Sequence, residues 1–103
     1  MNVALKKLPG LIAEELAAAN EKNPAFHSPH EGYAVLLEEV EEAGEALENI
    51  NVAMKMMWSH IKHDSPKAFE WAKRVEQNAL LLAAEAIQVA AMAQKYQAME
   101  GGE

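Results

Sequence analysis

Two pairs of polar residues, each with two residues between its members, have the clearest potential for chemistry in this sequence. Glu39 and Glu42 form the first pair, and Glu85 and Gln88 form the second. Side chains three residues apart lie on the same face of a helix, so both members of a pair can face one point. If the two segments lie side by side in the fold, three carboxylates and one amide oxygen converge.

Glu85 lies in the most apolar part of the chain. Between Ala79 and Ala93, only Glu85 and Gln88 are polar, and a charged carboxylate in such surroundings is costly unless it is paired. Three explanations are open: a bound cation, a lysine partner, or a protonated carboxyl group that is hydrogen-bonded to a neighbour. Converging carboxylates repel one another where water is scarce, and a hard cation such as Mg²⁺, Mn²⁺ or Ca²⁺ relieves that repulsion. We therefore predict a cation site with oxygen ligands.

Other side chains with chemical potential are less distinctive. His60 and His63 have a spacing that can bind metal, but histidines near the end of a helix are also favoured by its dipole alone. Four cationic side chains could contact phosphates, and nothing in the sequence distinguishes one of them: Lys55, Lys73, Arg74 and Lys95.

Three helices are predicted to position these side chains, at about residues 9–21, 29–62 and 66–98. Helix-favouring residues dominate the composition, and strand signals are nearly absent. Pro9 suits the first turn of the first helix. Ser28-Pro29-His30-Glu31 combines an N-cap serine, a proline at the first helical position and a glutamate three residues after the cap, which is a capping box. Pro66, after Asp64 and Ser65, marks the third start.

The predicted helix 29–62 carries two apolar stripes. The first repeats at alternating spacings of three and four, as in a coiled-coil seam, and comprises Tyr33, Leu36, Val40, Ala43, Leu47, Ile50, Met54, Met57 and Ile61. The second comprises Val35, Ala46, Ala53 and Met56. Glu39 and Glu42 share the flank of the second stripe, so we predict that both are partly buried, whereas Glu38 points away from the first stripe.

The predicted fold is all-α: an antiparallel helical bundle of one shorter and two long helices within a single domain, residues 1–103. The segment 79–93 is apolar nearly all round, whereas a helix on a protein surface has a polar face. Three helices from one chain do not surround such a segment. We therefore predict that homo-oligomerisation completes the bundle, as a homodimer or homotetramer.

Composition excludes several classes of function. The 103 residues include sixteen acidic and nine basic residues, for a formal charge of −7, which argues against nucleic acid and anionic membranes as partners. The absence of cysteine excludes disulfides, zinc–thiolate sites and thiol nucleophiles. The N-terminus shows no signal peptide, and the apolar run 79–93 is shorter than the ~20 residues that a bilayer crossing needs. A cytoplasmic location is expected.

The two polar pairs resemble the signature of the MazG-like, all-α nucleoside triphosphate pyrophosphohydrolases, which also include dimeric dUTPases and dCTP pyrophosphatases. That signature is E-x-x-E on one helix, often preceded by a further glutamate, and E-x-x-D on the next. Here Glu38-Glu39-Val40-Glu41-Glu42 fits the first motif and Glu85-Ala86-Ile87-Gln88 fits the second. The resemblance covers about residues 29–96. Gln88 stands where the family has aspartate, and Val35 stands at a position that is often lysine.

The resemblance implies divalent-metal-dependent hydrolysis of a nucleoside triphosphate to the monophosphate and pyrophosphate. Mg²⁺ or Mn²⁺ is expected to be held by Glu39, Glu42 and Glu85, with Gln88 as a weaker, uncharged ligand, and to lower the pKa of the attacking water. Glu38 is the candidate base or outer ligand by its place in the motif, although the first stripe turns it outward. The alternative is a non-catalytic helical-bundle protein of related descent with an assembly or regulatory role, which the seam and the missing aspartate favour.

Overall fold

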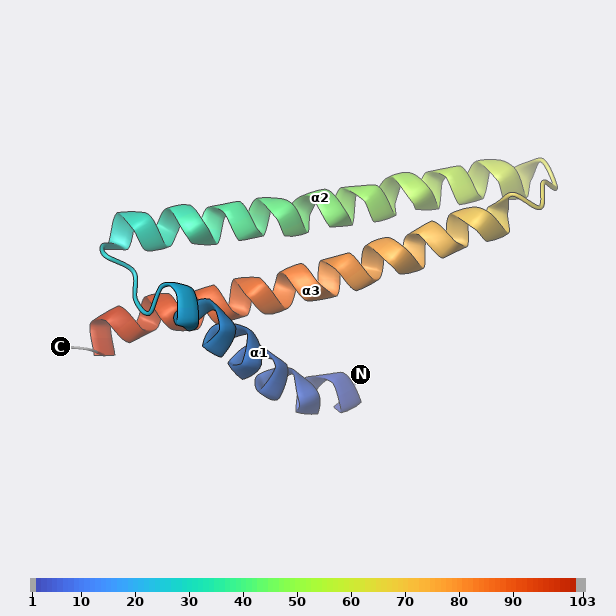
Figure 1. The fold of residues 1–103 in the computed structure, drawn as a ribbon. Coiled ribbons are helices and arrows are strands. Elements are labelled where there is room, and N and C mark those ends of the chain that lie inside the picture. The colour runs from blue at the N-terminus through green and yellow to red at the C-terminus, as the bar shows by residue number, and fades with distance from the viewer. Residues whose placement is uncertain (1, 102–103) are drawn as a thin grey trace. The chain divides into compact units, whose positions relative to one another are not determined.

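The computed structural model describes the backbone of residues 2–101, and this part of the chain is helical without strands (Figure 1). Helix α1 spans Asn2–Lys22, α2 spans Pro29–Lys62 and α3 spans Ala68–Gly101. The prediction of an all-α fold with one shorter and two long helices is confirmed. None of the helices in the described range is both long enough and apolar enough to cross a membrane.

The start of α1 differs from the prediction. The helix begins at Asn2 and includes Pro9 in its interior, although a proline there removes one backbone hydrogen bond and costs about 3 kcal/mol. Alanine, leucine and lysine occupy residues 4–8, and these residues have high helix propensity. The high propensity of this segment favours helix on the N-terminal side of Pro9 as well.

The start of α2 is capped almost as the sequence predicts. Ser28 Oγ accepts a hydrogen bond from the Glu31 backbone N–H at 3.1 Å, which satisfies one of the amides that a helix start leaves unpaired. Glu31 Oε1 accepts a hydrogen bond from the backbone N–H of His27 at 3.2 Å, whereas a capping box would use the amide of Ser28. The cap therefore extends one residue further and ties the preceding connection to the helix.

A tight turn joins α2 to α3 (Figure 1). Asp64 adopts a left-handed conformation with φ of 53°. The Ser65 N–H donates to the His60 carbonyl at 2.9 Å and the Asp64 N–H donates to the Ile61 carbonyl at 3.1 Å, which is the bonding of a Schellman motif. Ser65 Oγ then accepts from the Lys67 N–H at 3.3 Å. Because of these bonds, α2 ends at Lys62 and the regular part of α3 begins at Ala68.

The chain forms two compact units. The first contains α1, α2 as far as Val40, and α3 from Glu85 onward; the second contains residues 41–84. The core of the first unit is a cluster of Phe26, Ala91 and Met92. Partly buried apolar residues from all three helices pack against this cluster: Ile12, Leu16, Ala19, Val35, Leu36, Tyr96 and Met99.

Gly32 allows the start of α2 to approach that core closely. A Cβ atom at this position would lie 2.6 Å from Tyr96 Cδ2 and 3.0 Å from Phe26 Cδ2. We expect Gly32→Ala to lower the free energy of unfolding by up to about 2 kcal/mol, because overpacking a core costs about 1–3 kcal/mol and alanine returns about 1 kcal/mol of helix propensity. Urea denaturation measures this difference.

Gly10 is the matched control for that substitution. It lies inside α1, and a Cβ atom there meets nothing within 4 Å. Gly10→Ala is therefore expected to raise the free energy of unfolding by up to about 1 kcal/mol through helix propensity alone. If Gly32→Ala were stabilised as much as Gly10→Ala, the close packing of Phe26 and Tyr96 on α2 would be disproved.

The second unit is a helical hairpin whose buried side chains are all alanine. Ala46, Ala53 and Ala68 are 6%, 2% and 9% exposed, and small side chains let helices approach closely. Ala46 and Ala53 belong to the second predicted stripe of α2, so this stripe is the one that faces the hairpin. The larger residues of the first stripe are only half-buried or exposed, with Leu47 and Met54 near 50% exposed.

Candidate metal centre

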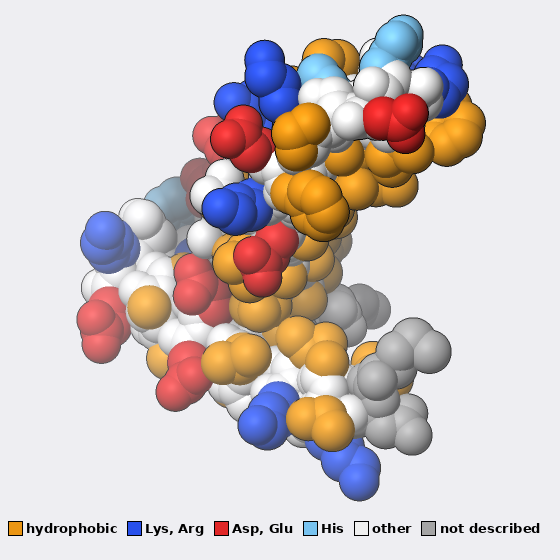
Figure 2. All heavy atoms as spheres, turned by 90° about the vertical axis from the view of Figure 1, so that its right-hand side faces the viewer, with side chains coloured by type: hydrophobic (Ala, Val, Ile, Leu, Met, Phe, Trp, Pro, Cys, Tyr) orange, Lys and Arg blue, Asp and Glu red, His pale blue; other side chains and the backbone are white. Residues whose placement is uncertain are grey.

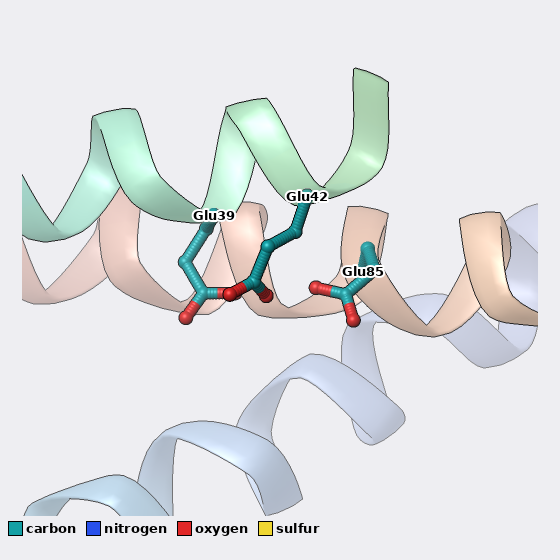
Figure 3. Close-up of side chains that lie close together, drawn as sticks. All are labelled: Glu39, Glu42 and Glu85. Atoms are coloured by element: carbon teal, nitrogen blue, oxygen red, sulfur yellow. The ribbon is translucent and has the colours of Figure 1, made fainter. Parts of the chain in front are cut away.

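Three carboxylates from two helices that are distant in sequence converge in the structure. One oxygen atom each of Glu39, Glu42 and Glu85 lies within 4.8 Å of the other two, and the three side chains point toward one another (Figure 3). Glu39 and Glu85 belong to the first unit, and Glu42 follows Glu39 by one turn of the uninterrupted helix α2. Helix periodicity sets the spacing of the α2 pair, and packing within the first unit brings α3 to it.

The separations suit a single hard cation. Oxygen ligands contact Mg²⁺ or Ca²⁺ at about 2.0–2.6 Å, so two oxygens on one ion lie at most about 4–5 Å apart. The 4.8 Å limit of this group falls within that range. Carboxylate oxygens are also the donors that these ions prefer over nitrogen or sulfur. The side chains thus fit a Mg²⁺, Mn²⁺ or Ca²⁺ ion in both distance and donor type.

Burial makes the convergence of negative charge costly. Glu39 and Glu85 are half-buried, and Glu42 is exposed. Glu85 Oε2 is buried and accepts no hydrogen bond from any residue that the structure describes. A buried acceptor left in this way costs about 1–3 kcal/mol, and more when it is charged. A cation at the centre of the group would supply the missing partner.

The structure narrows the explanations for Glu85. No residue whose side chain the structure describes donates a hydrogen bond to Glu85 Oε2, so the lysine alternative receives no support at that oxygen. A bound cation and a proton held in the carboxyl group remain. Both relieve the repulsion between converging carboxylates, but only a cation uses all three side chains as ligands.

The predicted site residues differ in their exposure. Glu38 is exposed and does not belong to the converging group. Gln88 is half-buried, one helical turn beyond Glu85 on α3. The prediction that Glu42 is partly buried is wrong. Both residues share the face of α2 that carries the buried Ala46, but Glu39 belongs to the first unit, which contains the apolar cluster, whereas Glu42 belongs to the second unit, whose buried side chains are small alanines.

Lys95 is a buried charged residue that the sequence did not distinguish from the other cationic residues. Its side chain is 6% exposed, its Nζ donates a hydrogen bond to the backbone carbonyl of Asn23, and Nζ lies 4.8 Å from the centre of the Phe26 ring. One signal for its burial was available in the sequence. Lys95 follows Ala91, which lies in the apolar run of α3, by four residues, and residues four apart share a helix face. By contrast, His63 is exposed and its Nδ1 lies 2.7 Å from the Ser59 carbonyl oxygen.

Comparisons of the chain with models of protein families, with curated proteins and with solved structures gave no match. The resemblance to MazG-like pyrophosphohydrolases therefore stays a prediction that rests on the two polar pairs. The convergence of the three carboxylates is independent of that resemblance, because it follows from the distances between their oxygen atoms.

Proposed function

We propose that this chain is a divalent-metal-dependent hydrolase that converts a nucleoside triphosphate, or a related nucleotide, to the monophosphate and pyrophosphate. The observation that carries the proposal is the grouping of the Glu39, Glu42 and Glu85 oxygens within 4.8 Å. Mg²⁺ sites in enzymes that act on nucleotides are commonly built from a few carboxylates plus the phosphates of the substrate. Two half-buried carboxylates and one exposed carboxylate leave room for phosphate oxygens to complete the coordination.

Each residue has a distinct role in this proposal. Glu39, Glu42 and Glu85 would hold Mg²⁺ or Mn²⁺, and Gln88 offers an uncharged amide oxygen one turn away. The ion would supply a Lewis acid for the phosphates and lower the pKa of an attacking water. Glu38 is next to Glu39 in the chain and exposed to solvent, so it is the proposed proton acceptor.

A second candidate is an assembly role, and an apolar surface on α2 favours it. Large exposed apolar residues follow one another along α2 at spacings of three, four and seven: Tyr33, Leu37, Val40, Leu47, Met54, Trp58 and Ile61. We call this set the exposed seam. Its spacing is that of coiled-coil contact positions. Figure 2 shows hydrophobic side chains gathered at the end of the molecule that carries the α2–α3 turn.

A second copy of the chain is the proposed occupant of the exposed seam. The chain exposes 7726 Å², whereas a folded monomer of this mass exposes roughly 5,700 Å². The excess of roughly 2,000 Å² matches what one subunit of an obligate homodimer buries. Among the described residues, the only large apolar side chains that are buried are Phe26 and Met92. A homodimer, or a homotetramer built from it, serves either function.

A panel assay tests the proposed hydrolase. The purified chain is incubated with each common ribo- and deoxyribonucleoside triphosphate and Mg²⁺ or Mn²⁺, and released pyrophosphate is measured. Turnover of at least one nucleotide is expected, together with its complete loss in EDTA. If no nucleotide is turned over and neither metal raises the melting temperature, the hydrolase proposal fails and the assembly role remains.

A further inference from the structure

A pocket of about 450 Å³ lies in the first unit, beside the end of α1. Its wall includes the apolar side chains of Phe26, Val35 and Met92 and the basic side chains of Lys22, His27 and Lys95. This volume is within the range of small-molecule sites, about 300–1,000 Å³. The pocket is separate from the converging carboxylates, because Lys95 and Glu85 are ten residues apart on α3, about 15 Å along the helix.

The buried ammonium group of Lys95 is only partly compensated. Its contacts are one hydrogen bond to the Asn23 carbonyl and the face of the Phe26 ring, and no carboxylate pairs with it among the described residues. A lysine ammonium has three N–H donors, and burying a charge is costly unless an opposite charge compensates it. A carbonyl and an aromatic ring offer partial charges only. An anion in the pocket would complete the compensation.

The other polar groups of the pocket agree with an anionic ligand. Lys22 and His27 add basic groups to the wall, although the whole chain carries a formal charge of −7. Glu31 is the acidic residue in the wall, and its Oε1 already accepts a hydrogen bond from the His27 amide. Asn23 contributes its carbonyl to Lys95. Basic groups are therefore concentrated at this pocket, although the chain as a whole is acidic.

We propose that this pocket binds a phosphate ester with an apolar or aromatic body, with the phosphate contacting Lys95. A lysine ammonium is a point charge that suits a phosphate oxygen. Phe26, Val35 and Met92 supply an apolar surface for the body of the ligand, which inorganic phosphate lacks. The ammonium group of Lys95, a residue of α3, also lies beside the C-terminal end of α1, where the helix dipole favours a cation. Substitution of Lys95 therefore affects stability too, and its effect on binding is measured separately.

The test is a titration followed by amide NMR in the presence of EDTA. The probes are the four common ribonucleoside monophosphates, the corresponding nucleosides and inorganic phosphate. At least one monophosphate is expected to shift the amide signals of Phe26, Val35 and Met92 with a Kd below about 1 mM and at least about tenfold tighter than its nucleoside or phosphate alone, a difference of about 1.4 kcal/mol. The proposal is overturned if no monophosphate shifts these signals.

Variants identify the contact and separate this proposal from hydrolysis. Lys95→Gln is expected to weaken binding at least about tenfold, whereas Lys73→Gln, which removes the same charge from an exposed position in the second unit, leaves binding unchanged. Should Lys95→Gln fail to fold, Lys22→Gln at the exposed edge of the pocket is expected to weaken binding several-fold. Unchanged binding in the folded variant overturns the proposal. Glu85→Gln retains binding even if the hydrolase proposal fails.

Discussion

Glu85→Gln is expected to abolish metal-dependent pyrophosphate release, with a loss of about 10²-fold or more, while making the metal-free protein more stable. The activity falls because the substitution removes one of the three charges that would hold the ion, and a group that stabilises transition-state charge is commonly worth about 10²–10³ in rate. The stability rises because a glutamine amide can donate a hydrogen bond to the neighbouring carboxylates, whereas a third carboxylate repels them. We expect a gain of about 1–2 kcal/mol in EDTA.

Added metal should reverse the order of stability. A ligand at 100 times its Kd stabilises the folded state by about 2.7 kcal/mol, so Mn²⁺ or Mg²⁺ is expected to raise the melting temperature of the wild-type chain and leave that of Glu85→Gln unchanged. Differential scanning calorimetry with and without metal measures both effects. Glu45→Gln is the matched control, because it makes the same charge change at an exposed position of α2 outside the group. An equal response of wild type and Glu85→Gln to metal contradicts the site.

Met54→Glu is expected to dissociate the proposed homodimer. Met54 belongs to the exposed seam and is 51% exposed in the single chain. In a two-fold interface each substitution occurs twice, and like charges placed opposite one another in an interface cost several kcal/mol. The dimer Kd should therefore rise by about 10³-fold. Sedimentation equilibrium over a range of concentrations reports the mass of the species in solution.

Val52 provides the matched control for the seam. It is also an exposed apolar residue of α2, at 44%, but it lies outside the seam. Val52→Glu introduces the same charge and is expected to leave the mass unchanged. A wild-type chain that stays monomeric at about 100 μM, or a Val52→Glu variant that dissociates as fully as Met54→Glu, would show that the seam is not the interface.

Local signals in the sequence were sufficient to predict the helix ends that are capped. Ser28 and Glu31 cap the start of α2, and the Asp64–Pro66 turn ends α2. Each of these effects acts within a few residues, so each can be recognised in the sequence. The start of α1 was less predictable, since it depends on a balance between the propensity of residues 4–8 and the cost of Pro9. Helix periodicity also determines that Glu39 and Glu42 can face a common point.

Tertiary structure decided which partners these faces meet. The sequence shows two apolar stripes on α2 but contains no information on which of them lies against α3; the alanines at 46 and 53 face the hairpin and leave the larger residues of the exposed seam uncovered. Glu85 reaches the α2 pair because the first unit packs Ala91 and Met92 of α3 against Val35 and Leu36. The choice of Lys95 among four cationic residues likewise follows from burial. Periodicity specifies a direction around one helix, whereas convergence requires the register between helices, which only side-chain packing sets.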